Sequence, residues 1–172
     1  MASITLTSAA ANKRLRALND EKASIVAREA KVSHYTKAAG EDVEPPVYDY
    51  EGTRARITAI DDEVRAIRHA LHSFNATYVL PDQGITIDET LVLMAQLNDE
   101  ARRLDDLRSS LPMERETVLV SFNRTDASLF RYANYDIEQA GRDYDAVRAR
   151  VDALQLAVDM ANQTASFEVT LP

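Results

Sequence analysis

Two stretches of this chain place apolar side chains alternately three and four residues apart without a break. This spacing puts the apolar side chains on one face of a helix, as in helices that pack lengthwise against other helices. An isolated helix could not keep such a face in water, so each stretch needs a partner helix. The first stretch comprises Ile57, Ile60, Val64, Ile67, Leu71 and Phe74, and the second comprises Ala140, Tyr144, Val147, Val151, Leu154, Val158 and Ala161.

The two stretches belong to an internal repeat. The sequence Leu-Asn-Asp-Glu at 18–21 recurs at 97–100, and an Asn-x-Thr motif follows each apolar stretch, ending at Thr77 and at Thr164. We predict a single domain over residues 1–172, with repeats at 1–80 and 83–172. The predicted fold is mainly α: two duplicated antiparallel helical hairpins form a four-helix bundle, with a small β-hairpin insert and a short C-terminal strand.

Local signals predict where the helices begin and end. A first helix over residues 8–39 would have Thr7 as its N-cap and stop at Gly40, before an acidic, proline-containing loop at 40–50. Thr86 and Glu89 form a capping box that opens the third helix. The predicted core stripe of that helix is Met94, Leu97, Leu104 and Leu111, and Asp136 with Gln139 resembles a second capping box before the fourth helix.

A β-hairpin is predicted between the third and fourth helices. Residues 117–122 and 129–135 are rich in β-branched and aromatic side chains, and residues 123–128 are typical of a turn. Two strands alone are marginally stable in water, so this hairpin should pack on the helices or pair with another chain. Residues 166–171 alternate like a terminal strand, and residues 78–80 could form another before a turn at 81–84.

Composition limits the classes of function. The formal net charge of −8 argues against nucleic-acid binding and against binding to membrane surfaces. No apolar run is long enough for a membrane span and no secretory signal is evident, so a cytoplasmic location is expected. The first helix is basic, whereas its repeat counterpart at 86–111 is acidic. Either both are ordinary solvated faces, or these equivalent helices attract each other within a chain or between subunits.

Few residues suggest chemistry. His69 and His72 share a helix face, but they lie away from the apolar stretch and fit a solvated pair. Glu41 and Glu44 have the spacing of magnesium ligands but fall in the predicted loop. The acidic runs at 61–63 and 105–106 are typical of solvated faces, and with no cysteine there is no thiolate chemistry. We therefore assign no catalytic, cofactor-binding or metal-binding residue and no cofactor.

A second stripe, mostly of small side chains, lies beside each apolar stretch. Ala59, Ala66 and Ser73 accompany the first stretch, while Ala146, Ala153 and Met160 accompany the second. Together with the two apolar faces, these stripes offer more contact surface than one helical hairpin needs. This surplus favours a non-catalytic helical scaffold or interaction protein that forms homo-oligomers. The alternatives are a metal- or small-ligand-binding helical-bundle enzyme and, third, a toxin-like membrane-active protein.

The order of these features resembles the septicolysin-like family of small bacterial helical proteins. The resemblance covers nearly the whole chain and implies a mainly α protein with no established biochemical role. It supplies no catalytic residues. The features that carry it are the capped first helix, the acidic proline-containing loop, the exit Phe74-Asn75-Ala76-Thr77, the Thr86-x-x-Glu89 helix start, the arginine-containing segment before Asp136-Ile137, and Asn162-Gln163-Thr164.

Overall fold

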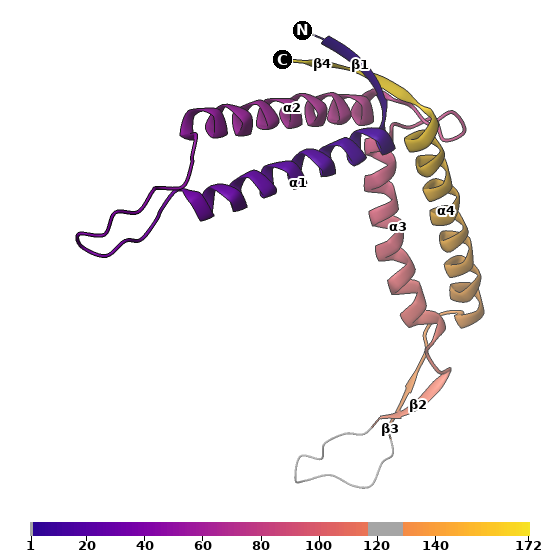
Figure 1. Cartoon of the computed structure of the whole chain (residues 1–172). Helices are drawn as coiled ribbons and strands as arrows, with labels where there is room; N and C mark the ends of the chain where they lie inside the picture. The colour runs from indigo at the N-terminus through magenta and orange to yellow at the C-terminus, as the bar shows by residue number, and fades with distance from the viewer. Residues whose placement is uncertain (1, 117–128) are drawn as a thin grey trace, which may run out of the picture. The chain divides into compact units, whose positions relative to one another are not determined.

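The computed structural model describes residues 2–116 and 129–172 (Figure 1). Helices dominate this part of the chain, and short strands form two antiparallel pairs. The mainly α fold predicted from the sequence is therefore confirmed. In chain order the elements are β1 (Ala2–Thr7), α1 (Ser8–Val32), α2 (Tyr50–Thr77), α3 (Ile87–Arg108), β2 (Met113–Glu116), β3 (Leu129–Tyr132), α4 (Ile137–Thr164) and β4 (Ser166–Leu171).

The chain divides into two compact units. The first contains Met1–Leu80 together with Asp159–Pro172, and the second contains Pro81–Val158. The first unit thus holds β1, α1, α2, the last residues of α4 and all of β4. The second holds α3, the β2–β3 pair and most of α4.

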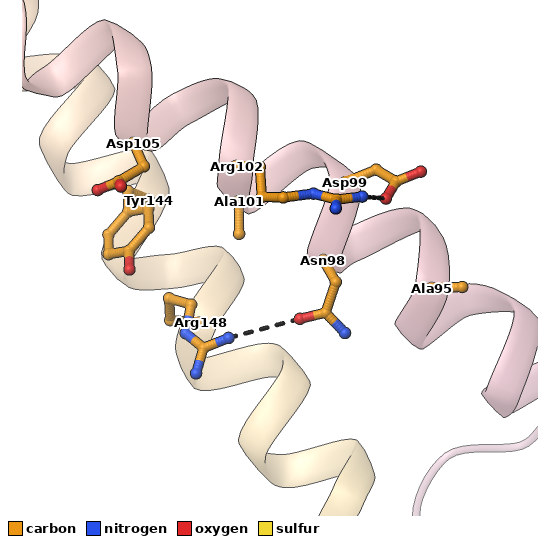
Figure 2. Close-up of a pocket in the computed structure, with 8 residues that line it drawn as sticks. All are labelled: Ala95, Asn98, Asp99, Ala101, Arg102, Asp105, Tyr144 and Arg148. Carbon is orange, nitrogen blue, oxygen red and sulfur yellow. Dashed lines mark hydrogen bonds and ion pairs between the residues drawn. The ribbon is translucent and has the colours of Figure 1, made fainter.

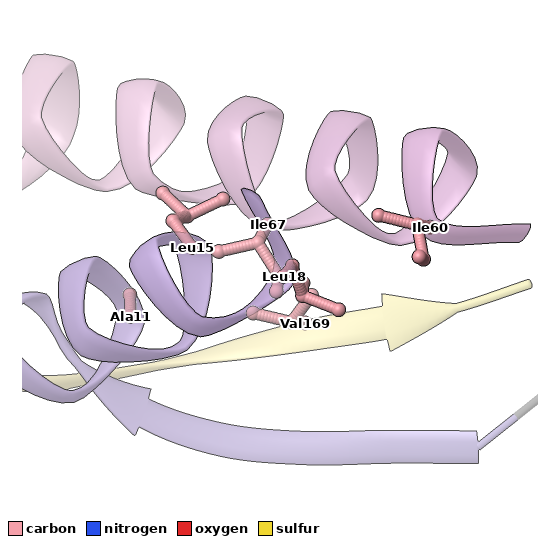
Figure 3. Packing of buried hydrophobic residues seen from close by; sticks show 6 residues of the cluster. All are labelled: Ala11, Leu15, Leu18, Ile60, Ile67 and Val169. Carbon is pink, nitrogen blue, oxygen red and sulfur yellow. The ribbon is translucent and has the colours of Figure 1, made fainter. Parts of the chain in front are cut away.

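In the first unit, α1 and α2 pack side by side in opposite directions (Figure 1). The terminal strands β1 and β4 form an antiparallel pair, with a register from Ala2 opposite Leu171 to Thr7 opposite Ser166. Val169 of β4 is fully buried and packs in one cluster with side chains of α1 and α2 (Figure 3). The core joins α1, α2 and β4, and its buried members are Ala11, Leu15, Leu18, Ile60, Ile67 and Val169.

The apolar spacing of α2 correctly predicts which of its faces is inside. Ile60, Ile67 and Phe74, seven residues apart, are buried, whereas the three alternate members of the stretch are half-buried. The ring of Phe74 also stacks on that of Phe167 in β4, with a centroid distance of 5.0 Å. The strand pair therefore completes a core that two helices alone would leave open on one side.

The first helix is shorter than its sequence predicts: α1 ends at Val32 and not at residue 39. Its N-cap is as predicted: the Thr7 hydroxyl accepts a hydrogen bond from the Ala10 N–H at 3.2 Å. At the other end the Tyr48 hydroxyl donates to Glu29, which brings the end of the loop back to the last turns of α1. Residues beyond Val32 would extend past α2 without a partner helix, and a few turns of unsupported helix are unstable in water.

The second unit is an antiparallel pair of helices formed by α3 and most of α4 (Figure 1). The capping box of α3 is confirmed: the Thr86 hydroxyl accepts from the Glu89 N–H at 3.2 Å, and Glu89 accepts from the Thr86 N–H at 2.8 Å. Leu104 is buried as predicted, but Leu111 is 63% exposed because α3 ends before it. The fourth helix begins directly after Asp136, whose carboxylate accepts from the Gln139 N–H at 3.0 Å.

The β2–β3 ribbon partly matches the predicted hairpin. Strand β3 lies inside the predicted segment 129–135, whereas the predicted strand at 117–122 and the turn at 123–128 lie outside the described residues. Strand β2 was not predicted, because Met113-Glu114-Arg115-Glu116 is mostly charged. Glu114 lies opposite Arg131, and their side chains are 2.9 Å apart. All four side chains of β3 are exposed, so they do not pack on the helices.

The Asn-x-Thr motifs end α2 and α4 in the same way. The Thr77 hydroxyl donates to the Ser73 carbonyl at 2.8 Å, and the Thr164 hydroxyl donates to the Met160 carbonyl at 2.7 Å. Each bond satisfies one of the last carbonyls of a helix, which have no partner within the helix itself. Both motifs are therefore structural helix ends.

Candidate functional site

The histidines and the glutamates that suggested metal chemistry lie on different elements, α2 and the loop before it. His69 and His72 are exposed on α2, as the sequence predicts. Glu41 accepts a hydrogen bond from the Ala38 N–H at 2.9 Å within the loop, and Glu44 is exposed there. In residues 2–116 and 129–172, no group of three or more His, Asp or Glu side chains is placed to hold a metal ion.

The acidic run at 61–63 links α2 to α1 instead of remaining only solvated. The Lys22 ammonium lies 2.6 Å from Asp61, and Arg14 forms an ion pair with Glu63. Part of the positive charge of α1 is thus balanced by α2, its partner within the hairpin. In α3, by contrast, Asp105 pairs with Arg108 one turn away, with 2.7 Å between their side-chain atoms.

An open cavity of about 350 Å³ lies between α3 and α4, inside the second unit (Figure 2). Its α3 wall combines small and polar side chains, and its α4 wall consists of Tyr144 and Arg148. Ala101 is buried at its base. The lining residues are Ala95, Asn98, Asp99, Ala101, Arg102, Asp105, Tyr144 and Arg148.

Most charges around this cavity are already paired. Arg102 forms an ion pair with Asp99, and Asp105 pairs with Arg108. The Arg108 guanidinium also lies over the Tyr144 ring, 3.9 Å from its centroid. The hydrogen bond to Asp105 raises the pKa of Arg108, so this group stays charged. These pairs leave the walls locally neutral apart from Arg148.

Arg148 is held more loosely than its neighbours. Its guanidinium lies 3.4 Å from the Asn98 amide oxygen (Figure 2). It also lies 4.0 Å from the Asp152 carboxylate. Charge-assisted hydrogen bonds are usually about 2.7–2.9 Å long, so both distances are long for such a donor. The cavity therefore contains one guanidinium without a close anionic partner. The sequence did not reveal this site because its walls come from segments some fifty residues apart, as for Arg148 and Asn98.

The outward face of α4 carries an exposed apolar stripe opposite its buried face. Leu156 is 62% exposed, and Met160 continues the spacing one turn further at 60%. Aspartates lie along one flank of this face, seven residues apart, at 145, 152 and 159. We call this surface the α4 stripe. It consists of Ala146, Ala149, Ala153, Leu156 and Met160, all exposed and spaced alternately by three and four residues.

The outward face of α1 has the opposite charge. Lys13, Arg16, Arg28 and Lys31 are exposed there, among small side chains and a single acid, Asp20. Within the described residues, none of the four cations forms an ion pair with a carboxylate. We call this surface the basic face of α1.

Comparison with known proteins shows a related fold but no function. No protein-family model matches the chain, and no curated protein matches it either. The crystal structure of a functionally unknown conserved protein from Corynebacterium diphtheriae is similar, with a TM-score of 0.57 and 11% sequence identity. The similarity covers 95% of this chain and 99% of that chain. At this identity it shows the fold alone, and the resemblance to the septicolysin-like family stays a prediction.

None of the helices described has the length and apolar character needed to cross a membrane.

Proposed function

We propose that this protein is a non-catalytic interaction protein that associates with copies of itself. In this proposal the α4 stripe of one copy packs on the basic face of α1 of another. The observation that carries it is the α4 stripe: an apolar face with regular helix-packing spacing lies exposed on a helix whose opposite face is already buried. Apolar patches of this kind typically mark protein–protein contacts.

The geometry of the stripe favours a helix as its partner. Alternating steps of three and four residues keep a row of side chains in register with a neighbouring helix. The alanines at 146, 149 and 153 would let the two backbones approach closely, and Leu156 would supply the larger apolar contact. Burying a leucine side chain fully contributes about 1.5–3 kcal/mol, so several such contacts are needed for stable association.

The charges beside the α4 stripe indicate which helix is its partner. The stripe has Asp145 and Asp152 on its flank, so two copies of α4 packed antiparallel would bring like charges together. The basic face of α1 offers cations and small side chains in place of that repulsion. Like charges that face each other across an interface are unfavourable, whereas opposite charges steer association and fix the register.

We also propose that the chain arose by duplication of a helical hairpin. Two observations support this: the threonine N-caps at 7 and 86, and the matching hydroxyl-to-carbonyl bonds of Thr77 and Thr164. The four-helix bundle expected from the sequence stays a prediction.

Self-association can be measured by size-exclusion chromatography with multi-angle light scattering over a range of protein concentrations. We expect the wild-type protein to show a mass above that of one chain. Leu156→Glu should shift the mass to that of a monomer, because a carboxylate would then lie in the apolar contact. Leu91→Glu is the matched control, since Leu91 is 47% exposed on α3 and lies outside the stripe. A strictly monomeric wild-type protein would rule out the proposal.

Charge reversal tests the choice of partner surface. One variant carries Lys13→Glu and Arg16→Glu on the basic face of α1, and the other carries Asp145→Arg and Asp152→Arg beside the α4 stripe. Each variant alone should be monomeric, because its own two surfaces then have like charge. An equimolar mixture should assemble again, because each altered surface meets an opposite charge on the other variant. If the Lys13/Arg16 variant alone assembles like the wild type, α1 is not the partner of the stripe.

A further inference from the structure

We propose that the cavity between α3 and α4 binds a small organic carboxylate with a planar body. None of the five residues of the α4 stripe lines this cavity, so the site is separate from the stripe itself. Asp152, which flanks the stripe, is the 4.0 Å partner of Arg148. Its volume of about 350 Å³ lies at the lower end of the range typical of small-molecule sites, roughly 300–1,000 Å³.

Arg148 determines the charge of the ligand. The other ionised groups of the lining are engaged: Arg102 with Asp99, and Asp105 with Arg108. The Arg148 guanidinium has only the long contacts of 3.4 Å and 4.0 Å described above. A planar guanidinium matches the two oxygens of a carboxylate, which would bind both of its N–H groups at once. The Asn98 amide lies beside it and can hydrogen-bond the same group.

Tyr144 and the alanines determine the body of the ligand. The Tyr144 ring is half-buried at the cavity wall and has the Arg108 guanidinium against it, 3.9 Å from the ring centroid. That contact holds the ring in place, so it offers a fixed apolar surface to a flat molecule. The buried Ala101 leaves room between the helices where a larger side chain would close the cavity, and Ala95 lines the cavity further along α3 (Figure 2). Aromatic rings prefer offset-stacked or edge-to-face contacts with other rings, which suits an aromatic carboxylate.

Binding can be tested with benzoate as the probe and measured by isothermal titration calorimetry and by NMR spectroscopy of the full chain. Benzamide is the matched neutral probe, because it has the same shape without the charge. We expect benzoate to bind at least about tenfold more tightly than benzamide, since a hydrogen bond to a charged group contributes more than a neutral one. Chemical-shift changes should centre on Asn98, Tyr144 and Arg148.

Two variants and one control variant connect the binding to the cavity. Arg148→Gln should weaken benzoate binding at least about tenfold, while Arg150→Gln should leave it unchanged, because Arg150 is exposed on the same helix and does not line the cavity. Ala101→Leu should abolish binding of both probes by filling the base. Circular dichroism of each variant checks that the helices are intact.

The proposal is overturned if benzoate gives no saturable signal up to about 10 mM. This concentration is tenfold above a Kd of about 1 mM, which corresponds to a binding free energy of roughly −4 kcal/mol. It is also overturned if benzamide binds as tightly as benzoate, or if Arg150→Gln weakens binding as much as Arg148→Gln. Should Ala101→Leu fail to fold, the comparison between Arg148→Gln and Arg150→Gln still decides the question. Loss of self-association in the Leu156→Glu variant would leave benzoate binding unchanged, so the two proposals fail separately.

Discussion

Truncating Ile67 to alanine tests whether the first unit derives its stability from the α1–α2–β4 core. Ile67 is fully buried, and its neighbours in the core come from both helices and from β4. The substitution removes three carbon atoms, which at ~0.8 kcal/mol each amounts to about 2.4 kcal/mol of lost burial. Because the surrounding elements can collapse only partly into the space, a cavity term raises the expected loss to about 3–4 kcal/mol.

The loss can be measured by urea denaturation followed by circular dichroism. For a urea dependence of about 2 kcal/mol/M, the midpoint of the affected transition should fall by roughly 1.5–2 M. Val26→Ala is the control in the same unit, because Val26 is 45% exposed on α1 and should change the midpoint little. If the two units unfold separately, only the transition of the first unit should move. A loss below about 1 kcal/mol, or one equal to that of the control, would show that this core does not stabilise the unit as argued.

Three further predictions concern hydrogen bonds at helix ends. Thr86→Ala should lower the free energy of unfolding by about 1 kcal/mol in thermal or urea unfolding, because it removes the N-cap of α3. The hydrogen bond from the Thr86 N–H also lowers the pKa of Glu89. The stabilisation from this carboxylate is therefore complete above its unfolded-state pKa and is lost as the pH falls through its folded-state pKa. Glu89→Gln should weaken this acid dependence of the unfolding free energy. The hydrogen bond to Glu29 raises the pKa of Tyr48 to about 12, so its stabilisation is present below pH 10 and is lost as the pH rises through about 12. In an alkaline absorbance titration one tyrosine should ionise late, and Glu29→Gln should abolish that late phase; an unchanged titration would contradict the contact.

The sequence predicts most of the helical structure because local rules govern it. Helix starts at Thr7 and Thr86 follow from a hydroxyl that accepts a backbone N–H, and the buried face of α2 follows from its spacing. The errors occur where contacts between distant parts of the chain determine the local structure. Strand β1 was not predicted because its partner β4 lies at the opposite end of the chain. Helix α1 ends early because α2 begins only at Tyr50, and no local sequence signal predicts an end at Val32.

The candidate site could be predicted only in part. The small-residue stripe of α4 was visible as Ala146, Ala153 and Met160, but the sequence alone does not distinguish an inward stripe from an exposed one. The cavity could not be predicted, because it depends on how Tyr144 and Arg148 meet a wall from α3. Its only local signal was the absence of large side chains at 95 and 101.

The cations of α1 separate into two groups with different consequences. Arg14 and Lys22 pair with carboxylates of α2, but their side chains remain 46% and 36% exposed, and exposed pairs of this kind contribute about 0–1 kcal/mol each. The hairpin must therefore be held mainly by its apolar core, while the charges set the register of the two helices. The outward cations Lys13 and Arg16 have no such partner within the described chain, so their charge is available for another copy. Because salt screens exposed charges and leaves apolar burial largely intact, high ionic strength should weaken self-association much more than it lowers the stability of the hairpin.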